Sequence, residues 1–207
     1  MVYTDRASAG RALGIELEYL RASQPLVLGL PRGGIPVAAA VREVIGGDLD
    51  ILLVRKLGVP WQPELAMGAI GEGGVRVLNP DVLAHTGITP HQCAEVEEAE
   101  RIELERRRLV LRGDAKPITP SGRTVVIVDD GMATGATVMV ACRVVRRQQP
   151  ARIVVAVPVS SAEALDRVEA EADEVICPLV PRILGGVGAA YRDFHQLGDA
   201  EVTALLR

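Results

Sequence analysis

The chain has 207 residues and a net charge of −4, and it is 48% hydrophobic but only 2% aromatic. A chain of this length can bury a sizeable core, and its charge balance excludes the strongly basic composition typical of DNA-binding proteins. No uncharged stretch reaches the roughly eighteen apolar residues of a membrane span, and the start of the chain lacks the pattern of a leader. We therefore expect a cytoplasmic protein with a single domain over residues 1–207, and no DNA or membrane partner.

The cysteines and histidines do not form a metal-binding pattern. Cys93, Cys142 and Cys177 are widely spaced, and no histidine lies near them at ligand spacing. We expect three reduced thiols in packing roles.

The first part of the chain alternates apolar runs with turn signals. Leucines at helical spacing after Asp5 predict a helix near the N-terminus, packed over one edge of the fold. The aliphatic run 26–30 predicts a strand, and a helix after it ends at the Gly46–Gly47 pair. Residues 50–57 predict a second strand.

The middle of the chain has a different composition. Residues 58–74 are rich in glycine and proline, which predicts a hairpin-like or irregular excursion. Residues 89–112 form a charged helical pattern with glutamate and arginine four residues apart. A solvated face is the favoured interpretation of those charges, and a lid remains open as an alternative. We expect the region of about 58–115 to be an insertion.

The remaining residues return to short aliphatic runs. Strands are predicted at 124–128, 152–159 and 174–180, with helices over 135–147, 161–171 and 200–207. Aliphatic strands without polar alternation are typical of a parallel sheet covered by helices on both faces. The pattern therefore predicts an α/β fold.

The segment TVVIVDDGMATGATV (residues 124–138) carries the strongest functional signal. Asp129 and Asp130 follow a buried strand, at the end where parallel sheets bind ligands. The loop behind them offers backbone amides, two threonine hydroxyls and a helix N-terminus, which together predict a phosphate site. The lysine of a P-loop and the GxGxxG spacing are both absent. Two carboxylates beside a phosphate site suit a ligand with vicinal hydroxyls, such as a ribose 5-phosphate.

In these residues the sequence resembles the type I phosphoribosyltransferases, although Gly131 stands where that signature usually has an aliphatic or small polar residue. The resemblance implies that Asp129 and Asp130 bind the ribose hydroxyls of phosphoribosyl pyrophosphate. It also implies that the 5-phosphate is bound by the loop of Gly131, Met132, Ala133, Thr134, Gly135, Ala136 and Thr137.

Two further segments are similar to those of the family. LGLPRGG (28–34) lies where the family wraps the pyrophosphate, often with a non-proline cis peptide, which implies contacts from Arg32, Gly33 and Gly34. VRKLG (54–58) is similar to a segment of adenine-type members, which implies that Arg55 and Lys56 face the pyrophosphate or its Mg²⁺.

The resemblance also implies the architecture and the reaction. We expect a five-stranded parallel sheet flanked by helices, a flexible loop, a small hood near residues 178–197 and a homodimer. A nitrogenous base would displace pyrophosphate from the ribose, with Mg²⁺ as cofactor, and catalysis would depend on Arg32, Lys56, Asp129 and Asp130. Residues 58–74 are our candidate for the cover that excludes water.

The acceptor base is the least defined part of this prediction. Ala133 stands where 6-oxopurine members usually have an aspartate, so the segment is closer to the adenine, uracil or orotate branches. Tyr191 and Phe194 in the hood are candidates for stacking on a base, and Trp61 lies on the candidate cover.

Two other functions remain open. The chain could bind phosphoribosyl pyrophosphate as a non-catalytic regulator, although the four catalytic candidates favour an enzyme. An enzyme that uses NAD or a nucleoside triphosphate is a third possibility, weakened by the missing fingerprints.

Overall fold

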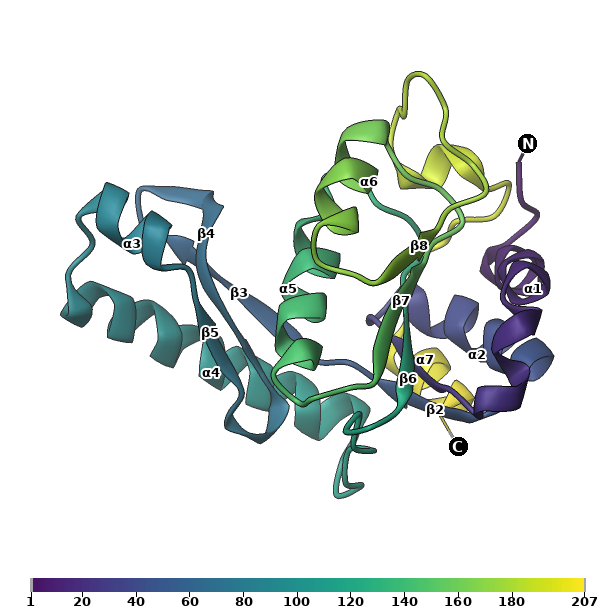
Figure 1. The fold of residues 1–207 in the computed structure, drawn as a ribbon, viewed down its shortest axis with the longest axis horizontal. Helices are drawn as coiled ribbons and strands as arrows, with labels where there is room; N and C mark the ends of the chain where they lie inside the picture. Colours follow the sequence, from purple (N-terminus) through teal and green to yellow (C-terminus); the bar gives the residue numbers. More distant parts are fainter. Residues whose placement is uncertain (1, 207) are drawn as a thin grey trace.

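A five-stranded parallel sheet forms the centre of the protein, whose computed structural model describes residues 2–206 (Figure 1). The strand order is β2-β1-β6-β7-β8, and all four pairings are parallel. The strands are β1 (Leu26–Gly29), β2 (Asp48–Ile51), β6 (Thr124–Val128), β7 (Arg152–Ala156) and β8 (Glu174–Ile176). The predicted α/β class and parallel sheet are confirmed.

Helices cover both faces of this sheet (Figure 1). Val27 and Val126 pack on one side, while Leu28 and Ile127 pack on the other. The first side is covered by α1 (Arg6–Glu16) and α2 (Gly34–Ile45), and the second by α5 (Ala136–Arg146) and α6 (Ala162–Glu169). Because both faces are buried, the central strands are apolar throughout, which explains the uninterrupted aliphatic runs.

The N-terminal helix begins as the sequence predicts but packs elsewhere. The Asp5 carboxylate accepts a hydrogen bond from the Ser8 amide at 2.7 Å and caps α1. The helix then packs along α2, and Leu13 and Leu17 join the core over the face of the sheet. The expectation that this helix covers an edge is therefore wrong.

A second sheet lies between β2 and β6 in the chain. It is antiparallel, in the order β3-β4-β5, and the helices α3 and α4 follow it in the chain (Figure 1). Its elements are β3 (Val54–Val59), β4 (Gln62–Gly71), η2 (Glu72–Gly74), β5 (Arg76–Leu78), α3 (Pro80–Thr86) and α4 (Pro90–Leu111). The excursion is thus a hairpin with Trp61 in its turn and a register shift at Gly58, and the long charged helix is confirmed.

The single strand predicted at 50–57 is two strands in different sheets. The chain leaves the parallel sheet after Ile51, and β3 begins at Val54. Leu52 and Leu53 between them are both buried, so hydrophobicity continues through the break. An apolar run shows that a segment is covered, but it does not show which sheet the segment joins.

Two other predicted strands end early. β7 ends at Ala156 and β8 at Ile176, in each case two residues before a proline, Pro158 or Pro178. Proline has no amide hydrogen to donate to a strand ladder, which accounts for both ends.

The C-terminal segment passes beside the N-terminus. Its η3 (Val187–Ala190) leads to Tyr191, which forms a bridge with Tyr3, and the segment ends in α7 (Asp199–Leu205). η1 (Glu18–Ser23) completes the elements. Across residues 2–206 no helix combines the length and hydropathy that crossing a membrane requires.

Candidate active site

The candidate site lies at the point in the parallel sheet where successive strands change from one side of β1 to the other. From β1 the chain moves outward to β2 on one side, and β6 lies on the other side. The Leu30 amide donates a hydrogen bond to the Val128 carbonyl at 2.9 Å, so the loops that follow β1 and β6 leave the sheet side by side. A crevice at such a switch point is the expected ligand site of an open parallel sheet.

The acid pair and the glycine turn, far apart in the chain, touch each other at this crevice. A Cβ atom added to Gly33 would lie 1.9 Å from Oδ2 of Asp130, and one added to Gly34 would lie 2.5 Å from the Val128 carbonyl oxygen. Only glycine leaves space for this approach. The peptide bond between Pro31 and Arg32 is cis, as the resemblance implied. The two predicted segments therefore form one site.

The acid pair is buried beside a cation that sequence reasoning missed. Burial raises the pKa of Asp129 well above its ordinary value, and the charge of Asp130 raises it further. Burial also raises the pKa of Asp130, while a hydrogen bond from Arg6 opposes that rise. Arg6 Nε lies 2.9 Å from Asp130 Oδ2, and both side chains are largely buried. Arg6 thus offsets the negative charge of Asp130.

Arg6 also joins the acid pair to the C-terminal segment. Its Nη1 donates a hydrogen bond to the His195 carbonyl at 3.0 Å, and its guanidinium lies 3.9 Å from the centre of the Phe194 ring. The Tyr191 hydroxyl donates a hydrogen bond to the Asp130 carbonyl at 2.6 Å. The sequence holds no local signal for these contacts, because the hydrogen bonds join residues that are 61 and 189 positions apart.

The phosphate loop has the free amides that its predicted role needs. Among residues 2–206, no hydrogen bond is formed by the amides of Ala133, Thr134, Gly135 and Thr137. They surround the N-terminus of α5 and line a cavity of about 230 Å³ together with Asp129. The Met132 amide is different, because it donates to the Val159 carbonyl at 2.9 Å and so anchors the loop. Met132 therefore lines the cavity without offering its amide to a ligand.

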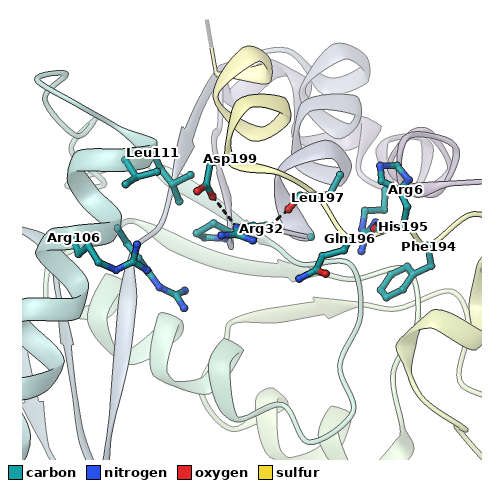
Figure 2. Close-up of a pocket in the computed structure, with 13 residues that line it drawn as sticks. Arg6, Arg32, Arg106, Leu111, Phe194, His195, Gln196, Leu197 and Asp199 are labelled. Carbon is teal, nitrogen blue, oxygen red and sulfur yellow. Dashed lines mark hydrogen bonds and ion pairs between the residues drawn. The ribbon is translucent and has the colours of Figure 1, made fainter.

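The predicted basic residues lie on two sides of the Pro31–Arg32 turn. Arg32 lines a cavity of about 480 Å³, where its Nε is 2.8 Å from Asp199 Oδ1 (Figure 2). Arg55 and Lys56 line a separate cavity of about 520 Å³, together with Thr137. Arg55 pairs with Glu100 of α4 at 2.6 Å, and Lys56 with Glu64 at 3.3 Å. Pro31 borders both cavities.

The two aromatic candidates differ in accessibility. Tyr191 is 6% exposed, with Tyr3 on one side at 5.8 Å between ring centres and Phe194 stacked on it at 5.0 Å. It has no open face for a base, so the suggestion that Tyr191 stacks on the acceptor is corrected. Phe194 is 37% exposed and lines the Arg32 cavity.

The described part of the chain has no side-chain cluster of the kind that commonly binds a metal ion. Residues 2–206 contain no group of three or more histidine, cysteine, aspartate or glutamate side chains that could bind a metal ion. Mg²⁺ is commonly bound by one or two carboxylates together with phosphate oxygens of a substrate. The adjacent Asp129 and Asp130 fit that second arrangement.

Comparison with known families decides the assignment of the fold. Residues 6–192 match the model of the phosphoribosyl transferase domain. The chain belongs to the phosphoribosyl transferase family. Two Mycobacterium tuberculosis proteins, provisionally named phosphoribosyl transferases, are 47% identical to it over 205 residues. The alignment covers 99% of this chain and 46% of each of those proteins, so the chain spans about half their length.

Solved structures agree with this assignment. The crystal structure of the protein TT1426 from Thermus thermophilus is similar with a TM-score of 0.90 and 44% identity, over 100% of this chain and 98% of that one. A hypoxanthine-guanine phosphoribosyltransferase from Bacillus anthracis shares the fold, with a TM-score of 0.50 and 13% identity over 83% of this chain and 78% of its own.

Proposed function

We propose that this member of the family transfers ribose 5-phosphate from phosphoribosyl pyrophosphate to a nitrogenous base and releases pyrophosphate. The observation that carries the proposal is the packing of Asp130 against Gly33 and of Asp129 against Gly34, beside a loop with four free amides. Carboxylates suit the vicinal hydroxyls of a ribose, and free amides at a helix N-terminus suit its phosphate.

In this proposal each group of residues has a separate task. Asp129 and Asp130 accept hydrogen bonds from the ribose hydroxyls and orient the ring, while the loop of residues 131–137 binds the 5-phosphate. Arg32 and the turn that contains Gly33 and Gly34 lie beside the leaving pyrophosphate. Positioned donors at a group where negative charge develops are commonly worth several kcal/mol. When bound, Mg²⁺ would supply further neutralisation of the pyrophosphate charge.

The remaining parts of the proposal concern the architecture. Residues 1–207 would act as one unit in which the region of about 58–115 is an insertion and residues 178–197 form the hood. Phe194 is the aromatic side chain left to contact an acceptor. The homodimer remains a prediction, which sedimentation at several protein concentrations would check.

The test combines binding with turnover. The protein is incubated with Mg²⁺, phosphoribosyl pyrophosphate and a panel of nucleobases, and released pyrophosphate is measured. The double variant Asp129→Asn/Asp130→Asn should lose binding of phosphoribosyl pyrophosphate, while Asp166→Asn on the exposed surface of α6 should retain it. Binding without release for every base would favour the regulatory alternative, and no binding by the unmodified chain would overturn the proposal.

A further inference from the structure

The cavity beside Arg32 has a second wall that neither the motifs nor the family match assigns. It lies between the Pro31–Gly33 turn, the segment 194–199 and the C-terminal half of α4 (Figure 2). From α4 come Arg106 and Arg107, with Val110 and Leu111 as the apolar part. The helix that the sequence marks as a solvated face therefore borders the candidate site.

Cations outnumber carboxylates around this cavity. Four arginines line it (Arg6, Arg32, Arg106 and Arg107), but Asp199 is the one carboxylate among the lining residues. Arg106 and Arg107 share a single partner, Glu103, at 2.8 and 2.9 Å. Hydrogen bonds from Arg106 and Arg107 lower the pKa of Glu103 to about 2, so this glutamate is ionised and one charge serves two guanidinium groups.

Arg107 has unused donors in this arrangement. Its Nε donates to Glu103, and among residues 2–206 neither of its Nη atoms forms a hydrogen bond. Arg107 also lines the neighbouring cavity that contains Arg55 and Lys56. It therefore stands at the junction of the two cavities that flank the Pro31–Arg32 turn.

We propose that Arg106 and Arg107 of α4 form, with Arg32, a binding site for pyrophosphate between the glycine turn and the insertion. The inference rests on the proposed function, since pyrophosphate is the group that the reaction would release. Guanidinium groups on two sides of a cavity suit a ligand with two linked phosphates, because each planar guanidinium can donate two parallel hydrogen bonds to one phosphate. The Glu103 pairs lie on the surface, where such pairs contribute little stability, so an exchange of Glu103 for phosphate oxygens has a small cost.

Asp199 has the opposite effect on this site. Its carboxylate forms an ion pair with Arg32 Nε at 2.8 Å, within the cavity that the pyrophosphate would enter. A carboxylate there competes with phosphate oxygens for Arg32 and repels them. Removal of its charge should therefore strengthen binding, an outcome that general damage to the fold does not produce.

The experiment is calorimetric titration of the full chain with inorganic pyrophosphate in the presence of EDTA, so that protein cations alone neutralise the ligand. Arg107→Gln should weaken binding about tenfold or more, the loss typical of a hydrogen-bonded charge, and Arg106→Gln should act in the same direction. Asp199→Asn should strengthen binding several-fold. Arg101→Gln is the matched control, because Arg101 lies on the same helix in a similar pair with Glu97 and outside the cavity.

The outcomes separate this inference from the proposed function. If the unmodified chain binds phosphoribosyl pyrophosphate but Arg107→Gln and Arg101→Gln bind pyrophosphate equally well, the inference is wrong and the proposed function stands. If the unmodified chain binds neither ligand, both are wrong. Arg107→Lys should recover part of the lost affinity, since it restores the charge without the planar donors.

Discussion

The parallel sheet and the outer face of α4, in the insertion between β2 and β6, are stabilised by different interactions. The inward side chains of β1, β6 and β7 are aliphatic and fully covered by helices. The long helix of the insertion instead carries a series of surface ion pairs, among them those of Glu97 and Glu103. Close packing positions atoms rigidly, whereas surface ion pairs exchange partners at little cost. The sheet is therefore suited to place the acid pair and the phosphate loop, and the insertion to offer charges that a ligand can recruit.

One buried ion network joins these two regions. Arg112, at the end of α4, has a side chain that is 3% exposed and contacts Asp50 at 2.6 Å and Glu72 at 2.7 Å. Asp50 belongs to β2 and also accepts a hydrogen bond from the Ile118 amide at 2.8 Å. The apolar sheet and the charged face of α4 thus meet at a junction that is both buried and charged.

The largest effect on stability should come from breaking that junction. Arg112→Met leaves two buried carboxylates without their cation, so the free energy of unfolding should fall by about 3–5 kcal/mol. Urea denaturation measures this free energy of unfolding. Arg167→Met, which removes an exposed pair with Glu163 on α6, should cost less than about 1 kcal/mol. Equal losses in the two variants would show that the junction is no more than another surface pair.

The next largest effect should come from disturbing the close packing beside the parallel sheet. Gly33→Ala places a methyl group where the Asp130 carboxylate lies, so the carboxylate must move. A displacement of about 1 Å in a positioning group can lower a reaction rate about a hundredfold. We expect a loss of similar order in affinity for phosphoribosyl pyrophosphate. Gly185→Ala is the control, because no atom lies within 4 Å of the added Cβ. Unchanged affinity in Gly33→Ala would mean that the acid pair does not bind the donor.

A smaller effect concerns the charge inside the core. Arg6→Met removes the cation beside Asp130, and an unpaired buried carboxylate costs about 1–3 kcal/mol. The pKa values of Asp129 and Asp130 are raised in the folded state, so their burial favours folding at low pH and opposes it as pH rises above the unfolded value near 4. Arg6 offsets the charge that appears over that range, whereas the Tyr191 hydroxyl donates its hydrogen bond to the main-chain carbonyl of Asp130 and not to the carboxylate.

The loss in Arg6→Met should therefore grow from about pH 4 to about pH 8. Denaturation curves at both values, with Arg11→Met on the exposed face of α1 as control, measure the difference. A loss that stays constant with pH would assign Arg6 to packing against Phe194 instead.

The same contrast explains how much could be predicted from the sequence. That the acid pair, the loop of residues 131–137 and the glycine turn lie together could be predicted, because each is a short segment that directly follows a strand of the parallel sheet. Arg6 was not, because its partner Asp130 is 124 residues away and no local pattern joins them. Arg106 and Arg107 were visible as charges on a helix, but which face of α4 meets the glycine turn depends on how the insertion packs. The prediction of a single strand at 50–57 was wrong for a related reason, because hydrophobicity indicates burial but not which strand lies alongside.

The smallest expected effect is that of Trp61→Ala, a variant that tests which part of the insertion covers the site. The sequence suggested residues 58–74, and Trp61 in the hairpin turn is 56% exposed and lines neither of the two cavities beside Pro31. Trp61→Ala should change the free energy of unfolding by less than about 0.5 kcal/mol and leave affinity for pyrophosphate unchanged, in contrast to Arg107→Gln. α4 borders both cavities, whereas the hairpin borders only the cavity of Arg55 and Lys56, so the helix is the nearer cover of the Arg32 cavity in this conformation. Pyrophosphate release rates in the two variants provide the check, since a large loss for Trp61→Ala with normal binding would require the hairpin to close over the site during turnover.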